Sequence, residues 1–263
     1  MSYTYAVTSQ RATAVHFAKV CYLTSSEDKN LVLAKGNRIE VHKYTVEGLQ
    51  LETEFPLYGR IASLGCYRPH GQLLDVLFVL TEKKQFTVLG YDTETKEFNA
   101  KFSGSLKDKL GHDRDSGIKG ILDPENRMVG MLLCEGMIKI IPIEQSGMKE
   151  SFNSRLEISR ILDCVFLHGQ AKPCMAVLFE DHRMQRHVKT YTVDTREREL
   201  MVGPWQQDKV NDGAKMLIPV PAPACGKLES HYSILFEVFY TYLSSFRKQS
   251  LTHSLFFFLS YII

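Results

Sequence analysis

The first residues that could perform chemistry are two aspartates in the polar segment 112–117, which reads His-Asp-Arg-Asp-Ser-Gly. Alternating carboxylates begin the calcium-binding loop of an EF-hand, so calcium binding is the chemistry to test. That loop needs glycine at its sixth position and glutamate at its twelfth. Counted from Asp113, those positions hold Ile118 and Pro124. The pattern therefore indicates a polar loop between structural elements instead of a metal site.

Other polar clusters also lack a catalytic pattern. His182 and His187 flank a basic turn, but no cysteine or carboxylate recurs around them at metal-ligand spacing, which favours a solvated hairpin tip. Segment 194–199 mixes both signs of charge and suits an exposed turn more than a pair of catalytic carboxylates. The chain contains no nucleophile elbow, P-loop or dinucleotide fingerprint. We therefore predict a protein that is not an enzyme, with no catalytic, metal-binding or cofactor-binding residues.

Composition and charge narrow the class of protein. The chain has 263 residues, of which 44% are hydrophobic and 24% charged, as in globular proteins. Its formal net charge of +2 gives no electrostatic sign of nucleic-acid or membrane binding. Six cysteines without a C-x-x-C pair are typical of buried free thiols in a reducing compartment. Because no basic segment followed by an apolar run opens the sequence, we expect no secretory signal and a location in the nucleus and cytoplasm.

The elements that must position the polar residues are four β-hairpins that recur about every 50 residues. Strands rich in small or apolar residues precede the last three hairpins, and such strands suit the crowded axis of a propeller. A period of this length built from hairpins is the sequence signature of a β-propeller. We predict blades of four strands: an inner strand, a middle hairpin and a variable outer strand. The hairpins are 30–44, 75–91, 129–143 and 174–193, and the inner strands are 59–67, 117–122 and 160–167.

Length and the end of the chain suggest a partial propeller. A seven-bladed wheel needs roughly 320 to 350 residues, whereas residues 1–226 provide about four to five blades. From residue 227 to 263 the sequence becomes rich in aromatic residues and loses the blade order. We expect an incomplete N-terminal β-propeller over 1–226 and a divergent tail over 227–263, either non-native or alternatively spliced. A membrane hairpin or tail anchor is the alternative, although both apolar stretches are shorter than the roughly 18 residues of a spanning helix.

Several strings resemble the family of the DNA damage-binding proteins, and all lie in one register across residues 1 to about 226. More distant relatives are the large subunit of the cleavage and polyadenylation specificity factor and the propeller subunit of splicing factor 3b. A scaffold subunit of an mRNA-processing complex is therefore the alternative function. The matching strings include MSYTYAVT (1–8), YGRIA (58–62), GIKGILDP (117–124), IKIIP (138–142), HVKTY (187–191) and GPW (203–205).

The resemblance implies a much longer protein with three seven-bladed propellers and a helical C-terminal domain. Such a protein is a non-catalytic adaptor that links a cullin-4 RING ubiquitin ligase to substrate receptors in DNA repair and protein ubiquitination. In the family, the first and third propellers form a cleft for a helical segment of the receptor, and the second propeller binds the cullin. This chain resembles most of the first propeller, so we expect it to lack the cullin site. The resemblance also implies that contact with damaged DNA runs through a partner receptor.

Propeller geometry indicates which residues bind partners. Turns that join the middle strands and loops that join consecutive blades emerge on one face, and exposed loops on a rigid scaffold are common recognition sites. A propeller hydrolase or lyase would instead need acids and histidines on several inner strands, where Asp163 is the single acid. The candidate partner-binding residues are Lys83, Lys84, His112, Arg114 and Glu135.

Overall fold

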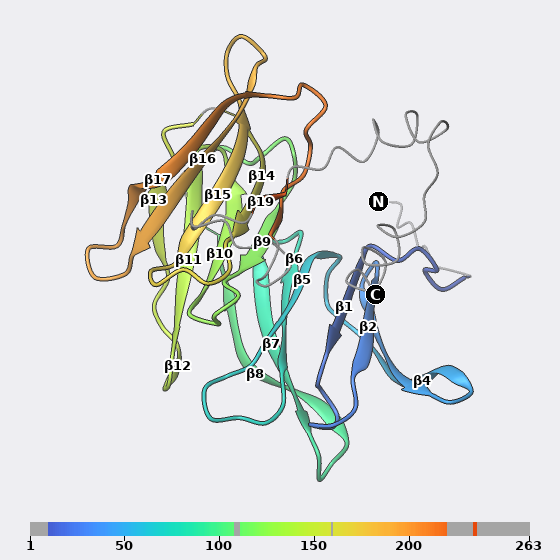
Figure 1. The fold of residues 1–263 in the computed structure, drawn as a ribbon. Helices are drawn as coiled ribbons and strands as arrows, with labels where there is room; N and C mark the ends of the chain where they lie inside the picture. The colour runs from blue at the N-terminus through green and yellow to red at the C-terminus, as the bar shows by residue number, and fades with distance from the viewer. Residues whose placement is uncertain (1–9, 108–110, 159, 220–233, 236–263) are drawn as a thin grey trace, which may run out of the picture. The chain divides into compact units, whose positions relative to one another are not determined.

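The computed structural model describes residues 10–107, 111–158, 160–219 and 234–235. Within these ranges every regular element is a β-strand, which confirms the all-β class (Figure 1). No helix that could span a membrane occurs in the described ranges. The chain divides into two compact units, Met1–Cys66 with Gln72–Lys107 and Tyr67–Gly71 with Asp108–Ile263.

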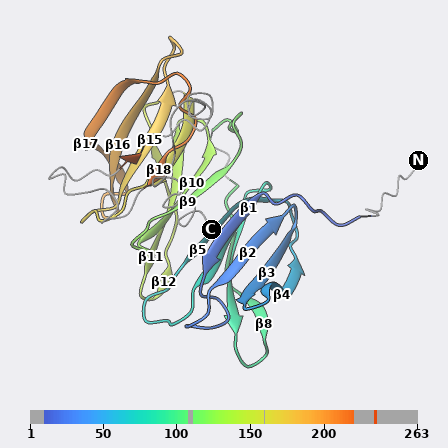
Figure 2. The same cartoon turned by 45° about the vertical axis from the view of Figure 1, so that its right-hand side comes forward.

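The first unit contains two four-stranded antiparallel sheets, apart from Tyr67 at the end of one strand. In both sheets the strands lie side by side in chain order, as Figure 2 shows for β1 to β4. The first sheet consists of β1 (Phe17–Cys21), β2 (Asn30–Lys35), β3 (Arg38–Thr45) and β4 (Gly48–Pro56). The second sheet consists of β5 (Ile61–Tyr67), β6 (Val76–Thr81), β7 (Gln85–Asp92) and β8 (Glu97–Ser105).

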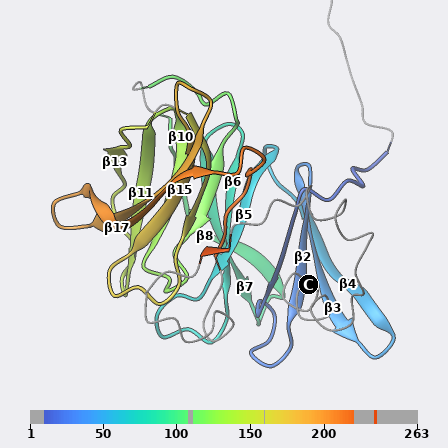
Figure 3. The same ribbon diagram turned by 45° about the horizontal axis from the view of Figure 1, so that its top comes forward.

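The second unit contains the third and fourth sheets, and Figure 3 shows β10, β11 and β13 as neighbours. The third sheet consists of β9 (Lys119–Leu122), β10 (Met128–Cys134), β11 (Met137–Glu144), β12 (Gly147–Met148) and β13 (Phe152–Arg155). The fourth sheet consists of β14 (Arg160–Phe166), β15 (Cys174–Glu180), β16 (Arg186–Asp194) and β17 (Glu199–Val210). Two short strands, β18 (Ile218–Pro219) and β19 (Ile234–Leu235), pair with each other.

The predicted blade order is confirmed in all four sheets. Each predicted hairpin forms the second and third strands of a sheet, the predicted inner strands precede the last three, and an outer strand follows each. The second strands are the most deeply buried: every residue of β6 and β10 is buried. Most residues of the outer strands β4, β8 and β17 are exposed. These sheets are the blades of a partial β-propeller.

The outer strand of the third sheet is divided in two because of Pro142. Residues Met137 to Ile140 of β11 pair with β13, whereas Ile143 and Glu144 pair with β12. At the break, the Pro142 carbonyl accepts the amide N–H of Lys149 at 2.9 Å. A proline has no N–H to return to the outer strand, so the ladder cannot continue through this position.

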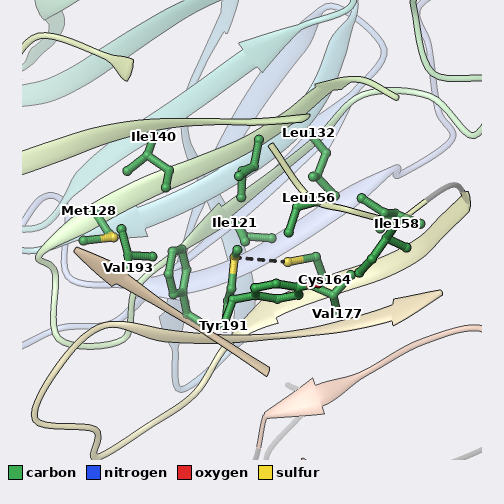
Figure 4. Packing of buried hydrophobic residues seen from close by; sticks show 14 of the residues in the cluster. Ile121, Met128, Leu132, Ile140, Leu156, Ile158, Cys164, Val177, Tyr191 and Val193 are labelled. Atoms are coloured by element: carbon green, nitrogen blue, oxygen red, sulfur yellow. Dashed lines mark hydrogen bonds between the residues drawn. The ribbon is translucent and has the colours of Figure 1, made fainter. Parts of the chain in front are cut away.

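Apolar side chains between neighbouring sheets form the cores. In the first unit, one cluster joins the first two sheets through residues such as Val32, Ile39, Leu77 and Val79. In the second unit, another joins the third and fourth sheets, where the Cys164 thiol lies 3.8 Å from the Met175 sulfur (Figure 4). Full burial of each aliphatic side chain contributes about 1.5 to 3 kcal/mol, so these clusters dominate the stability of each unit.

A further cluster covers the other face of the fourth sheet. Ala176, Leu178 and Val188 of this sheet pack with Ala214 and Leu217 from the segment that follows β17. All five side chains are at most 3% exposed. Residues 227–233 and 236–263 lie outside the described ranges, so the predicted boundary at residue 226 stays a prediction.

Candidate interaction surface

In the first three sheets, the turn between the second and third strands is hydrogen-bonded to a connection that enters or leaves the sheet. The Leu57 amide donates to the Asn37 carbonyl at 2.7 Å, and the Leu106 amide donates to the Lys84 carbonyl at 2.8 Å. In the third sheet the Glu135 amide donates to the His112 carbonyl at 2.9 Å. We call these turns and connections the loop face of each unit. The geometry predicted for turns and inter-blade loops is therefore present within each unit.

Lys83 and Lys84 occupy the β6–β7 turn on the loop face of the first unit. Lys83 is exposed, whereas Lys84 is half-buried and has a φ of 57°. The Lys84 amide donates to the Thr81 carbonyl at 3.0 Å, and the Thr81 hydroxyl donates to the Gln85 carbonyl at 3.1 Å. These bonds hold the backbone of the turn, so the exposed Lys83 side chain extends from a fixed backbone position.

His112 and Glu135 lie next to each other on the loop face of the second unit. His112 is exposed and Glu135 is half-buried. Glu135 also lines a surface cleft of about 420 Å³, with Met137 and Arg155 among its other lining residues. Among the described residues, one Glu135 carboxylate oxygen is buried and has no hydrogen-bond partner. That oxygen is closed to a partner because it is buried, and the Glu135 carboxylate interacts electrostatically with the buried Arg114 guanidinium.

Gly111 makes the close approach between the two loops possible. Its φ is 94°, and a Cβ at this position would lie 2.8 Å from the Met137 methyl group and 2.9 Å from Cys134 Cβ. Both distances are shorter than real Cβ contacts allow. Glycine at position 111 is therefore required for the loop with His112 to run along the β10–β11 turn.

The prediction that Arg114 is an exposed contact residue is wrong. Its side chain is 8% exposed, and its guanidinium donates to the Ile161 carbonyl at 2.8 Å, the Ser116 hydroxyl at 2.7 Å and the Gly117 carbonyl at 3.1 Å. Burial lowers the pKa of Arg114, and the nearby Glu135 carboxylate opposes that shift. Arg114 therefore ties the loop to β14, and its role is to position the loop face.

Asp163, the single acid on the predicted inner strands, is engaged in structural bonds. It forms an ion pair with Lys119 of β9 and accepts the Cys164 amide at 2.9 Å and the Leu217 amide at 2.8 Å. It is 3% exposed. The described residues contain no group of three or more His, Cys, Asp or Glu side chains that could hold a metal ion.

His187 is less solvated than the hairpin-tip interpretation predicts. Its side chain is 14% exposed, lies 3.0 Å from Asp208 and 3.4 Å from Asp181, and stacks on Phe179. A solvated tip was predicted because the sequence does not reveal two contacts of His187. Asp208 pairs with it from the outer strand, and the Phe179 ring stacks on it. His182 is exposed, as predicted.

Two features were missed by the sequence analysis. Arg127 binds the Asp123 carboxylate at 2.7 Å and donates to the Gln170 carbonyl at 2.8 Å, which links the turn before β10 to the turn before β15. In the first unit, a groove of about 640 Å³ is lined by outer-strand residues that include Phe55 and Phe98, whose rings are 5.0 Å apart. Both features join residues that are distant in sequence. The aromatic residues of the two outer strands were a signal for the groove, whereas no local pattern indicates the Arg127 link.

Comparison with known proteins identifies the family. Residues 14–255 match the family model described as the RSE1/DDB1/CPSF1 first beta-propeller. The chain is 45% identical over 225 residues to DNA damage-binding protein 1b and 44% identical over 228 residues to DNA damage-binding protein 1a, both from Arabidopsis thaliana. It is 44% identical over 225 residues to DNA damage-binding protein 1 from Solanum lycopersicum.

These alignments cover 85% to 86% of this chain and 21% of each relative, so the chain spans about a fifth of the length of the curated relatives it matches. The match to the family model and the identity to the relatives agree with the four sheets described above. The chain belongs to the family of the RSE1/DDB1/CPSF1 first β-propeller.

Proposed function

We propose that this chain is a non-catalytic binding module of a ubiquitin-ligase adaptor, and that it contacts the substrate receptors of cullin-4 RING ligases. The observation that carries the proposal is the identity of 44% to 45%, over 85% of the chain, to relatives named DNA damage-binding protein 1. Because the chain spans 21% of those relatives, adaptor activity is a proposal for the whole protein to which this segment contributes one surface. Its proposed location is the nucleus and cytoplasm.

The loop face of each unit, taken by itself, is a surface that we propose for receptor contacts. Loops held by a rigid scaffold keep their shape on binding, so little conformational entropy is lost. Lys83 and His112 are exposed there, and the backbone of Glu135 lies beside that of His112. Lys84 and Arg114 contribute by fixing the two loops. In this proposal, neither unit contains the cullin site.

The proposal is tested with purified components. The tagged 263-residue chain is incubated with a cullin-4 substrate receptor and, separately, with cullin-4. We expect the receptor to be retained and cullin-4 to be absent from the beads. The chain should also reduce the amount of receptor that co-precipitates with cullin-4 through the full-length Arabidopsis relative. Failure to retain receptor, together with an unchanged amount in the competition, would count against the proposal.

A matched pair of charge reversals tests the loop face. Lys83→Glu changes the β6–β7 turn on the loop face, whereas Lys96→Glu makes the same change in the exposed β7–β8 turn at the other end of the same sheet. A charge at the rim of an interface contributes up to about 1 kcal/mol, so Lys83→Glu should weaken receptor binding about fivefold. Lys96→Glu should bind like the unmodified chain, and equal effects of the two substitutions would exclude the loop face.

The second candidate function is a scaffold in mRNA processing. It is supported by the family model, whose description groups the first propeller of DDB1 with those of RSE1 and CPSF1. The same bead assay distinguishes the two functions when purified subunits of a polyadenylation or splicing factor replace the receptor. Retention of those subunits, without retention of a receptor, would favour the second function.

A further inference from the structure

Two thiols from the inner strands of the first unit meet between its two sheets. Cys21 is the last residue of β1, and Cys66 is the residue before the end of β5. The two thiol groups are hydrogen-bonded to each other, and the Cys66 sulfur lies 4.0 Å from the Val20 carbonyl oxygen. Cys21 is 3% exposed, whereas Cys66 is half-buried. Cys66 is therefore the more accessible residue of the pair, while Cys21 is enclosed in the apolar cluster between the two sheets.

The surroundings of the pair make the two thiols unequal. The hydrogen bond from Cys21 lowers the pKa of Cys66, and the positive charge of Lys19 supports that shift, whereas burial and the Asp75 carboxylate oppose it. The same hydrogen bond and burial raise the pKa of Cys21. A thiolate is the nucleophilic and oxidisable form of cysteine. Cys66 is thus the thiol that reacts first, and Cys21 is the neighbour that keeps its proton.

We propose that Cys21 and Cys66 form an oxidation site at which hydrogen peroxide, or another small hydroperoxide, converts the two thiols into a disulfide between β1 and β5. This inference does not depend on the proposed function. The disulfide is a reversible covalent link between the inner strands of two neighbouring blades in the first unit.

The reaction balances in two steps. The Cys66 thiolate attacks one peroxide oxygen, the O–O bond breaks, and the products are the Cys66 sulfenic acid and hydroxide, which takes up a proton to become water. The Cys21 sulfur, as it loses its proton, attacks the Cys66 sulfur; the S–O bond breaks and a second water leaves. The two thiols lose two electrons in total, and one peroxide is reduced to two waters.

The other described cysteines serve as internal controls. Cys134, Cys164 and Cys174 are buried. Burial raises the pKa of Cys164 to about 12 and also raises the pKa of Cys174. Buried thiols with raised pKa values react slowly with peroxide. A general sensitivity to oxidation would therefore be distinguishable from a reaction confined to one pair.

Peptide mapping of the full chain tests the link. The reduced 263-residue protein is treated with hydrogen peroxide, free thiols are blocked with iodoacetamide, and the protein is digested with trypsin without reduction. We expect one cross-linked species that joins Val20–Lys29 to Ile61–Lys83, lighter by two hydrogens than the two peptides together. Dithiothreitol should release both peptides. Recovery of both as carbamidomethyl peptides after peroxide treatment would overturn the proposal, and so would oxidation of Cys66 to sulfinic acid with Cys21 still free.

Single substitutions test which thiol reacts first. In Cys21→Ser, peroxide should leave a Cys66 sulfenic acid that dimedone traps, at least fivefold more than in the unmodified chain. Cys66→Ser should give neither dimedone adduct nor cross-link, and the control Cys174→Ser should form the cross-link normally. A dimedone adduct on Cys21 in Cys66→Ser would reverse the assigned roles and contradict the mechanism. The mapping of the unmodified chain stands independently if a variant fails to fold.

Discussion

At the scale of single residues, Thr190 shows how one hydroxyl can replace ladder bonds between two strands. Its Oγ1 donates to the Trp205 carbonyl at 2.6 Å and accepts the Trp205 amide at 3.1 Å, where the β16–β17 register shifts. A Cβ on Gly203 would lie 2.4 Å from the same Oγ1. The glycine of the Gly-Pro-Trp string is therefore required for the outer strand to approach Thr190.

Gly203→Ala should lower the free energy of unfolding by about 2 kcal/mol, because the new methyl group overpacks the site and displaces a buried hydroxyl from its partners. Urea denaturation measures the effect. The control is Gly90→Ala, another strand glycine, where the nearest atoms to the methyl group would belong to the flexible Lys101 side chain. If the two substitutions cost the same, the Thr190 contact has no special role.

At the same scale, His168 leads to a prediction about how the stability of the fold depends on pH. Burial lowers the pKa of His168, with the nearby Glu125 and Asp123 carboxylates opposing the shift. The unfolded chain then takes up a proton on this side chain at a higher pH than the folded chain does, so stability falls as the pH drops from about 6.5 through the folded pKa. The denaturation midpoint of His168→Gln should therefore decrease less between pH 7.5 and pH 5.5 than that of the unmodified chain. An exposed control, His182→Gln, should keep the original pH dependence, and a loss of dependence in both variants would argue against this assignment.

At the scale of elements, polar links between sheets supplement the apolar cores of the second unit. Arg114 reaches from the loop before β9 to β14, Asp163 joins β14 to Lys119 and to the Leu217 amide, and Arg127 joins two turns. The links made by Arg114 and Asp163 satisfy buried backbone groups that water cannot reach. Removal of one partner therefore leaves several groups without a bond.

Asp163→Ala should destabilise the second unit by about 3 kcal/mol, since the Leu217 and Cys164 amides lose their acceptor and Lys119 loses its counter-ion. Asp115→Ala is the control because Asp115 is exposed in the loop before β9 of the same unit. Amide hydrogen exchange is the more specific measurement: Leu217 should lose protection in Asp163→Ala and keep it in Asp115→Ala. Unchanged protection at Leu217 would mean that this carboxylate does not anchor the segment after β17.

The elements also show what the sequence can and cannot predict. The four hairpins were predicted because a strand buried on both faces, such as 76–81, leaves a continuous apolar run beside a polar turn. The division of the third outer strand at Pro142 was not predicted, because weakly patterned edge residues do not reveal their partners. Arg114 was misplaced for a related reason. Its burial depends on the Ile161 carbonyl from the next sheet, which no local pattern contains.

At the scale of the whole molecule, the charge of the chain bears on whether it contacts DNA directly or through a partner. Proteins that bind DNA by themselves neutralise several phosphates with clustered lysines and arginines. This chain has 32 basic and 30 acidic residues. Many of the basic side chains on the described strands face carboxylates, as Lys35 faces Glu40 and Arg38 faces Glu54. The relatives are named for binding damaged DNA, whereas the nearly balanced charge of this chain favours contact with DNA through a partner.

We therefore predict that the isolated chain binds duplex DNA no more tightly than non-specific proteins do, with a Kd of about 10⁻⁴ M or weaker at physiological salt. Fluorescence anisotropy with ultraviolet-damaged and undamaged duplexes of one sequence measures both affinity and preference. We expect equal affinities for the two duplexes, and loss of any binding when the salt concentration is raised. A damage-specific receptor added to the chain provides the positive control, because it should restore discrimination between the duplexes. Submicromolar, salt-resistant preference of the chain alone for the damaged duplex would show that the loops contact DNA directly, and would move the site of damage recognition from the receptor to this propeller.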